Sequence, residues 1–329
     1  MNIPSASGPE LVNLLALPSV SKLYEAVTTK RRSLPMSKGP EGLGFTKRLL
    51  EELVFAVELS LSRECSIFPV KRALKKVALK LFSEEENDIL VLIQAIRKKL
   101  ARTDKRVTIM DYGAGKPDLY LSQDAMKLGR KVEINIGRAS RTSSTSEKCG
   151  RFLFALLREV KSNECLELGA GFGISGLYLL GALELNNRGR LHTLEGSELL
   201  LNIARRNFQG FGINRVVTVL GNFCNTLTDT LSKVDSVDFT FVDGHHDEHA
   251  TKVYFSKIFP KTRAGGIIVF DDINWSEGMV RAWKSIKNAP GVAFSFDFHQ
   301  FGLVIKRGRN QGDIPGRHFK SGGLLFLFG

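Results

Sequence analysis

Acidic side chains recur where predicted strands end, and two of these places carry the residues best suited to chemistry. The segment FVDGHHDEH, residues 241–249, holds Asp243 and three histidines, and IIVFDDINW, residues 267–275, holds Asp271 and Asp272. In neighbouring parallel strands the three carboxylates would meet at one edge and repel one another unless a cation lay between them. Oxygen ligands select a hard ion, so these residues predict a Mg2+ site, with Mn2+ and Ca2+ as alternatives.

Plainer interpretations of these acids stay open. Asp243 could face a bound cofactor, and Asp271 could cap the helix that follows it. Enzymes that use no metal also place acids at the carboxyl ends of parallel strands, where ligands collect. The sequence therefore supports either a metal site or a set of acids that serve the cofactor and a helix end.

A glycine-rich turn is the second informative stretch. The segment ECLELGAGFGISGLYLL, residues 164–180, runs from a short apolar strand through Gly169, Gly171 and Gly173 into an apolar helix. Glycines remove side chains where the backbone turns sharply, so a ligand can approach the amides at the start of the helix. The segment predicts a nucleotide-type site at the carboxyl end of the first strand of an open α/β sheet.

The glycines can be aligned in two ways. Gly171, Gly173 and Gly176 spell G-x-G-x-x-G, and Glu195 lies 19 residues beyond, as the ribose-binding acid of a dinucleotide fold would. Starting at Glu167, the same stretch reads E-x-G-x-G-x-G, which resembles motif I of the class I S-adenosylmethionine-dependent methyltransferases. The resemblance implies that Glu167 helps to hold the amino acid part of the cofactor, and that the glycines admit its ribose and methionine portions.

Further cofactor contacts are expected around this turn. Glu195 ends the second strand, and a carboxylate there can accept hydrogen bonds from two ribose hydroxyls. Asn222, in L-G-N-F after the third strand, stands where related enzymes place a polar contact to adenine. Ser175 and Asp243 are also assigned to the cofactor by the resemblance. The alternative for Asn222 is a simple helix cap, and for Glu195 it is a place beside a helix start.

The elements that position these residues alternate between strand and helix from about Ser146 onward. Predicted strands at 164–168, 190–195, 216–220, 237–242 and 266–270 alternate with helices at 152–160, 174–185, 199–208, 226–231, 250–259 and 280–286. The final runs, 292–298 and 301–305, are too close together to be parallel and must form an antiparallel hairpin. Such an ending favours the seven-stranded, Rossmann-like sheet of a class I methyltransferase over an NAD-dependent oxidoreductase.

The D-G-H-H and D-D segments sharpen the resemblance. Metal-dependent small-molecule O-methyltransferases carry an Asp after strand four, an acidic pair or Asp-Asn after strand five, and a base three residues after the first Asp. His246 holds that position, as the His does in the D-G-x-H pattern of the macrolide-sugar type. The resemblance implies that His246 and Asp243 are catalytic, with a neutral imidazole taking the proton of a hydroxyl acceptor. The chain lacks the Lys and Asn of the catechol type.

The chain before Ser146 divides into three predicted parts. Residues 1–45 form an N-terminal arm, 46–105 a helical extension, and 106–145 a connecting segment; the methyltransferase domain covers 146–329. The connecting segment contains D-Y-G-A-G, which looks like a second strand-and-turn, but Pro117 and the polar residues after it provide no apolar helix. It is therefore rejected as the cofactor site, and is either a structural turn or a loop that helps to close the active site.

Composition limits the remaining possibilities. The net charge is +13, and residues 1–150 hold 26 Lys+Arg against 17 Asp+Glu, which fits solvated helix faces or an anionic partner. The four cysteines form no C-x-x-C pair, which fits a reducing compartment. No apolar run is long enough to span a bilayer and no secretory signal is evident, so we expect a cytoplasmic protein without a membrane span.

These observations predict an S-adenosylmethionine-dependent O-methyltransferase that acts on a small-molecule hydroxyl with the help of a divalent metal. An RNA ribose hydroxyl is the alternative acceptor, because the front half is basic. The absence of an N-P-P-Y-like segment after strand four argues against a base N-methyltransferase but leaves methylation of a ribose hydroxyl open. An NAD-dependent oxidoreductase and a non-catalytic cofactor-binding module are the remaining alternatives. The helical extension could form a lid or the contact of a homodimer.

Overall fold

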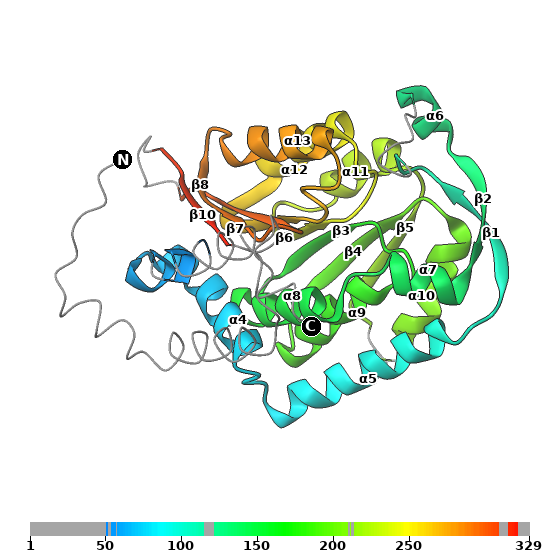
Figure 1. The fold of residues 1–329 in the computed structure, drawn as a ribbon, viewed down its shortest axis with the longest axis horizontal. Helices are drawn as coiled ribbons and strands as arrows, with labels where there is room; N and C mark the ends of the chain where they lie inside the picture. The colour runs from blue at the N-terminus through cyan, green and yellow to red at the C-terminus, as the bar shows by residue number, and fades with distance from the viewer. Residues whose placement is uncertain are drawn as a thin grey trace, which may run out of the picture.

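The computed structural model describes residues 51, 54–56, 58–114, 122–209, 211, 214–308 and 315–321. The predicted arm at 1–45 lies outside these residues. The rest is an α/β fold built on one large sheet with helices on both faces (Figure 1). No helix within the described ranges is both long and apolar enough to cross a membrane.

The central sheet contains the seven predicted strands and one more, in the order β10-β8-β9-β7-β6-β3-β4-β5. Their bounds are β3 Glu164–Leu168, β4 Arg190–Glu195, β5 Val216–Leu220, β6 Val237–Val242, β7 Thr262–Phe270, β8 Val292–Asp297, β9 Gly302–Lys306 and β10 Arg317–Lys320. Strands β3 to β7 are parallel, and β9 pairs antiparallel with both β7 and β8, which confirms the closing hairpin. The short strand β10, which pairs parallel with β8, was not predicted.

The chain order reverses at β3, which lies between β4 and β6. In an open parallel sheet, a crevice forms outside the carboxyl ends of the strands at such a reversal, and ligands bind there. The glycine turn directly follows β3. The fold therefore places this turn at the position where a ligand crevice is expected.

Helices cover the two faces of the sheet in separate groups (Figure 1). One face carries α8 Glu147–Val160, α9 Ile174–Leu185 and α10 Glu198–Gln209, and the other carries α11 Phe223–Ser232, α12 Glu248–Lys261 and α13 Glu277–Lys287. All the predicted helices of the domain are present, several with an extra turn at one end. Each group buries its own hydrophobic cluster against the sheet.

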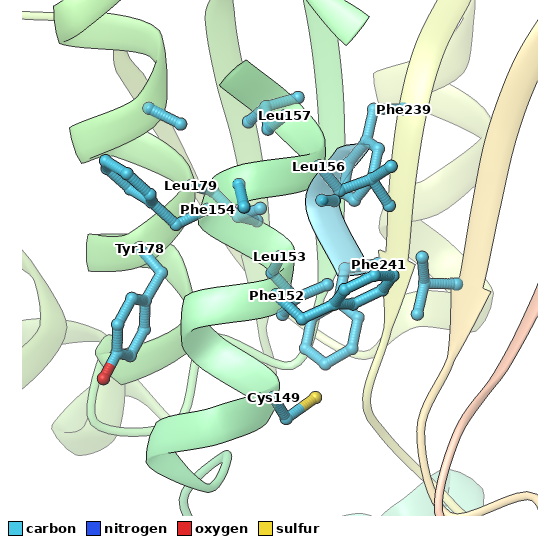
Figure 2. Packing of buried hydrophobic residues seen from close by; sticks show 14 of the residues in the cluster. Cys149, Phe152, Leu153, Phe154, Leu156, Leu157, Tyr178, Leu179, Phe239 and Phe241 are labelled. Carbon is cyan, nitrogen blue, oxygen red and sulfur yellow. The ribbon is translucent and has the colours of Figure 1, made fainter. Parts of the chain in front are cut away.

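Helix α8 shows why the first group packs so tightly. Its buried side chains, including Phe152 and Leu156, point to Phe239 and Phe241 of β6, while its other face meets Tyr178 of α9 (Figure 2). Since α9 lies under α8 and against the sheet, nearly all its residues are buried, which explains its continuous apolar sequence. The helix that follows the glycine turn is thereby held rigidly in the core.

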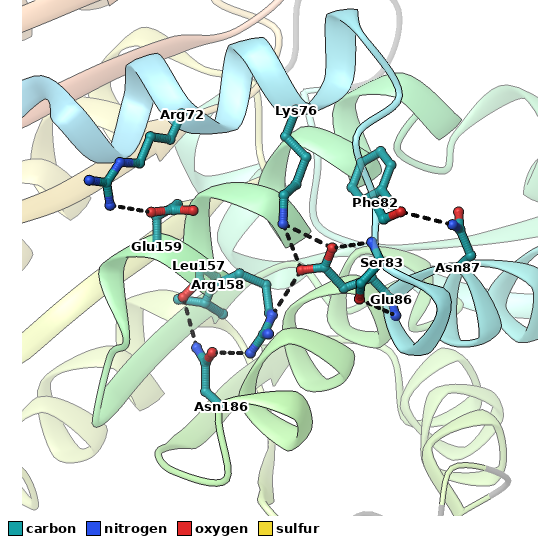
Figure 3. Close-up of polar contacts among 10 residues, drawn as sticks. All are labelled: Arg72, Lys76, Phe82, Ser83, Glu86, Asn87, Leu157, Arg158, Glu159 and Asn186. Atoms are coloured by element: carbon teal, nitrogen blue, oxygen red, sulfur yellow. Dashed lines mark hydrogen bonds and ion pairs between the residues drawn. The ribbon is translucent and has the colours of Figure 1, made fainter.

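The helical extension contains the short 3-10 helix η1 Cys65–Ile67, α4 Phe68–Ala78 and α5 Glu84–Ala101. A buried carboxylate, Glu86, joins it to the domain: Lys76 Nζ of α4 and Arg158 Nε of α8 donate to Glu86 Oε1 at 2.8 and 3.1 Å (Figure 3). Burial acts to raise the pKa of Glu86, but these cations and the amide of Ser83 outweigh it and lower the pKa. The extension is therefore fixed to the domain by buried charges as well as by apolar packing.

The connecting segment forms a two-stranded hairpin and two helices. Strand β1 Arg106–Asp111 pairs antiparallel with β2 Arg130–Asn135, and α6 Gln123–Leu128 and α7 Ile136–Thr142 flank β2. Strand β1 lies against α10 of the domain. The D-Y-G-A-G sequence thus begins at the end of a strand that runs along the edge of the domain.

Candidate active site

A cavity of about 260 Å3 opens at the carboxyl ends of β3, β4 and β6. Its wall contains Gly169 and Gly171 of the glycine turn, although not Gly173, and it also contains residues that are far apart in the sequence: Glu195, Asn222 and the D-G-H-H loop. The structure thus brings most of the predicted cofactor and catalytic residues to a single cavity.

The glycine turn needs its missing side chains for two different reasons. Gly169 and Gly171 have positive φ angles of +100° and +51°, which side-chain-bearing residues rarely adopt. A Cβ at Gly169 would overlap the carbonyl oxygen of Asp243, whereas a Cβ at Gly171 would meet no atom within 4 Å. Gly169 therefore allows β3 and the D-G-H-H loop to approach each other, and Gly171 leaves the cavity open.

Glu195 is the best-positioned acid of the cavity. Oε2 accepts a hydrogen bond from the amide of Gly171 at 2.8 Å, and Oε1 accepts one from the amide of Ser197 at 2.8 Å. Burial raises the pKa of Glu195, while these amides act to lower it. Each carboxylate oxygen keeps a further lone pair, so the group can still receive two hydroxyls of a ribose.

Glu167 does not line the cavity. It is fully buried beneath the turn, where Oε2 accepts from Thr193 Oγ1 at 2.5 Å and where no hydrogen bond from the described residues reaches Oε1. Burial raises its pKa to about 7, although the hydroxyls of Ser175 and Thr193 act in the opposite direction. Ser175, also assigned to the cofactor, does line the cavity and lies between Glu167 and the open space.

Asn222 combines the two roles that the sequence left open. It is the N-cap of α11, where its Oδ1 accepts from the amide of Cys224 at 2.9 Å. Its Nδ2 donates to the carbonyl of Lys127 at 3.3 Å, and the residue lines the cavity. A helix cap thus holds Asn222 beside the space where the adenine contact was predicted.

The D-G-H-H loop places His245 and the predicted base, His246, in different surroundings. Both have left-handed backbone, with φ of +64° at His245 and +48° at His246. The ring of His245 is buried, its Nδ1 lies 2.9 Å from Tyr254 Oη, and burial lowers its pKa to about 4. His245 therefore packs the loop, and His246 is left as the histidine that can face a substrate.

His246 stands between two of the predicted acids. Its Nε2 lies 3.7 Å from Asp243 Oδ1 and 3.8 Å from Asp272 Oδ2, and the residue lines the cavity. Loss of solvent lowers the pKa of His246, while the charge of Asp272 acts to raise it. The ring of Trp275, a residue that is 40% exposed, is an aromatic neighbour of His246, with the two ring centroids 6.2 Å apart.

The three acids of the predicted metal site are neighbours, but only Asp243 lines the cavity. Burial and the charges of Asp271 and Asp272 raise the pKa of Asp243 well above its usual range. Burial, with Asp272, raises the pKa of Asp271 to about 7, and Asp271 Oδ1 accepts from the amide of Asp272 at 2.9 Å. Within the described ranges, no group of three or more metal-ligating side chains is arranged to hold a metal ion.

Two segments before the domain also line the cavity and were not predicted as site residues. They are residues 109–113, at the end of β1 and beyond it, and 143–145, before α8. The D-Y-G-A-G sequence was the available signal, since a loop that helps to close the site was one of its two interpretations. The D-Y-G-A-G segment approaches the turn after β4 through packing between elements that are distant in the sequence, and local sequence patterns do not show such packing.

Comparisons with known proteins bear on the type of the domain. Residues 166–273 match the family model described as "Methyltransferase domain", which confirms the expected methyltransferase domain for this part of the chain. A probable cobalt-precorrin-6B C(15)-methyltransferase (decarboxylating) of Saccharolobus solfataricus is 28% identical over 130 residues, which are 39% of this chain and 62% of that protein. The chain thus spans less than two thirds of the length of this curated relative.

Solved structures with a similar fold include two O-methyltransferases. TomG from Streptomyces achromogenes, involved in tomaymycin synthesis and solved with SAM, is 22% identical with a TM-score of 0.44, over 50% of this chain and 82% of that one. The enzyme from Bacillus cereus, solved in complex with SAH, is 25% identical with a TM-score of 0.44, over 50% of this chain and 84% of that one.

Proposed function

We propose that this chain, with its methyltransferase domain at residues 166–273, is an S-adenosylmethionine-dependent O-methyltransferase. The observation that carries the proposal is the position of Glu195, whose carboxylate is held on the amide of Gly171 beside an open cavity at the reversal point of the sheet. A carboxylate fixed beside a glycine turn can receive the ribose of a nucleoside cofactor. Asn222 and Ser175 of the predicted cofactor set line the same cavity, whereas Glu167 and Gly173 of that set do not.

We propose a hydroxyl as the acceptor and His246 as its base. Bound S-adenosylmethionine supplies an electrophilic methyl group on a sulfonium sulfur, so the acceptor oxygen must lose its proton as it attacks. The O–CH3 bond forms as the S–CH3 bond breaks with its electron pair left on sulfur, and the proton passes to Nε2 of His246. The lowered pKa of His246 keeps the imidazole neutral at pH 7, which a base requires.

Asp243 and Asp272 support His246 in this scheme. Each carboxylate lies within 3.8 Å of Nε2, so either can accept a hydrogen bond from the imidazolium after a small rotation and stabilise its charge. Asp243 also lines the cavity and remains our candidate for a contact to the cofactor or to the acceptor.

The divalent metal remains a proposal. Three adjacent carboxylates, two of them with raised pKa values, form the kind of oxygen-rich acidic group that Mg2+ prefers, which supports it. As they lie here, however, the described side chains do not converge as ligands, so the arrangement does not fit a bound ion. We therefore derive no step of the reaction through a metal and leave metal dependence to experiment.

An RNA ribose hydroxyl is the second candidate acceptor, favoured by a basic hollow beside the cavity. This hollow of about 230 Å3 is lined by Arg97, Lys98 and Arg141, and it shares Ile174 with the cofactor cavity. Cations so close to the cavity could hold phosphates next to the methyl donor. Methylation of RNA that falls steeply with salt would favour this acceptor over a small molecule.

The location and assembly of the protein remain predictions. All four cysteines are free, which suits the cytoplasm, and cell fractionation would test that location. A homodimer through the helical extension is tested by light scattering of the full chain.

Calorimetry with S-adenosylhomocysteine, the product form of the cofactor, tests the proposed function. We expect one site with a dissociation constant of about 1 to 100 μM, the range of a typical substrate. Adding MgCl2 to the complex then tests the metal: a saturable heat that Asp271→Asn removes would support it, and no heat would exclude a Mg2+ site at these acids. A wild-type chain that binds no S-adenosylhomocysteine would overturn the methyltransferase proposal itself.

A further inference from the structure

Tyr112 is an aromatic residue of the cavity wall that comes from outside the matched domain. It follows β1 directly and lines the cavity together with Gly196, the residue after Glu195. A Cβ at Gly196 would lie 2.5 Å from ring atom Cδ2 of Tyr112, and a Cβ at Gly129 would lie 2.8 Å from Cε1 on the other edge. The ring therefore fits between two glycines, and a larger residue at either position would collide with it.

The backbone on both sides of Tyr112 is fixed by one carboxylate. Asp111 Oδ2 accepts from Arg130 Nη2 at 2.7 Å and from Arg130 Nε at 3.1 Å, so one guanidinium donates two charge-assisted hydrogen bonds to one oxygen across the hairpin. Asp111 Oδ1 accepts from the amide of Gly113 at 2.9 Å and so closes a tight turn around Tyr112. The hairpin thus holds the ring in place before any ligand arrives.

The same segment reaches the opposite side of the cavity. The amide of Ala114 donates to the carbonyl of His245 at 2.8 Å, and His245 precedes the proposed base. Residues 111–114 therefore extend from the turn that follows Glu195 to the loop that carries His246. A segment with these two attachments can shape the space for the cofactor while it supports the base.

We propose that Tyr112 is a cofactor-binding residue whose ring packs against the nucleoside of S-adenosylmethionine, held there by the Asp111–Arg130 pair. The proposal rests on the proposed function and assigns a role to the segment before the domain. The ring lies beside Gly196 at the Glu195 end of the cavity, where the ribose is expected, and an aromatic ring provides a flat apolar surface for a nucleoside.

Calorimetry with S-adenosylhomocysteine on full-length variants tests this role. We expect Tyr112→Ala to raise the dissociation constant about tenfold, within the range measured when an aromatic partner of a base is removed. Tyr112→Phe keeps the ring and should stay within about twofold of the wild type. Arg106→Gln is the matched control on the same hairpin, because Arg106 pairs with the exposed Glu133 and both side chains are more than half exposed. It should leave binding unchanged.

The packing of Tyr112 on Gly196 is tested by a double variant. Gly196→Ala should weaken binding by displacing the ring, so the variant that combines it with Tyr112→Ala should bind no worse than Tyr112→Ala alone. If the fold-changes in the dissociation constant of the two single variants multiply in the double variant, the two residues act independently and the proposed contact is wrong. If the wild type binds S-adenosylhomocysteine and Tyr112→Ala binds equally well, the role of Tyr112 is wrong while the proposed function stands. If the wild type does not bind S-adenosylhomocysteine, both the role of Tyr112 and the proposed function are wrong.

Discussion

The two ends of the cavity differ in how their acids are paired. At the end beside Glu195, which we propose to hold the nucleoside and call the nucleoside end, both carboxylate oxygens accept hydrogen bonds from backbone amides, and the fold fixes the glycine turn around it. At the other end, Asp243, Asp271 and Asp272 crowd together next to His246. Burial and the neighbouring carboxylate charges raise the pKa of Asp243 well above its usual range and that of Asp271 to about 7, because they disfavour the charged forms. The carboxylate at the first end already has hydrogen-bond partners. At the second end, the repulsion among the carboxylates would be relieved by a proton or by a bound ligand.

This difference suits the two ends of the cavity to different tasks, one to binding a cofactor and the other to moving a proton. A site that holds a cofactor gains from being rigid before binding, since little ordering remains to be done when the ligand arrives. A site that moves a proton needs groups whose pKa values lie near the working pH, and crowded, desolvated acids beside a histidine provide them. We therefore expect substitutions at the two ends to affect different measurements.

Gly169→Ala should have the largest effect, because it should lower the stability of the fold and abolish cofactor binding at the nucleoside end. The added Cβ would overlap the carbonyl of Asp243 in a backbone conformation of φ +100°, so we expect a loss of about 3 kcal/mol or more in the free energy of unfolding. Chemical denaturation and calorimetry would measure the loss of stability and of cofactor binding. Gly265→Ala is the control, because Gly265 has φ +73° but no atom within 4 Å of an added Cβ. Equal losses in the two variants would contradict the clash at Asp243.

His246→Ala should affect chemistry alone. We expect the methylation rate to fall by about 10²- to 10⁴-fold, as when a general base is removed, with the affinity for S-adenosylhomocysteine within about twofold of the wild type. A fall in affinity as large as the fall in rate would show that His246 belongs to the binding end.

The pH profile of the wild type adds a second check on His246. The neutral imidazole is the active form, and its pKa is lowered, so activity should be retained through pH 6.5 and lost only as the pH falls through the lowered value. The rate measured against pH tests this direction. An inflection above pH 7 in the rate would contradict a base with a lowered pKa.

Glu195→Ala should weaken binding without the collapse expected for Gly169. It removes the expected ribose partner and leaves the amides of Gly171 and Ser197 unpaired, so the dissociation constant for S-adenosylhomocysteine should rise about 10- to 100-fold. Asp272→Asn is the comparison at the other end and should leave that affinity within about twofold. An effect of Asp272→Asn as large as that of Glu195→Ala would remove the distinction between the two ends.

Glu167→Gln should have the smallest effect on binding, because Glu167 is buried behind Ser175 and does not line the cavity. Its folded pKa of about 7 lies above the ordinary value of 4.5, so wild-type stability should fall as the pH rises from 4.5 to 7. The amide carries no charge, so the variant should melt higher than the wild type at pH 8 and similarly at pH 4.5. A weakened affinity would instead support the predicted contact of Glu167 with the cofactor.

Local sequence patterns determined most of the domain. The strands and helices from Ser146 to Ile305 follow from apolar runs of fixed period, and β4, β5, β6 and α9 have the predicted bounds. The glycine turn and the acids at strand ends could be placed on one edge because parallel strands in one sheet end on the same side. These features depend on neighbours in sequence or on a general rule of α/β sheets.

Only the tertiary structure decided the parts that depend on distant contacts. The role of His245, which the sequence left open, became clear because its Nδ1 lies beside Tyr254 Oη of α12. Glu167 is turned away from the cavity by its hydrogen bond from Thr193 on the neighbouring strand. Strand β10 is too short to show the alternation of apolar and polar residues that marks a strand, so its pairing with β8 could not be predicted from the sequence. Tyr112 reaches the cavity because β1 lies along α10, a contact that packing creates and that no local pattern records.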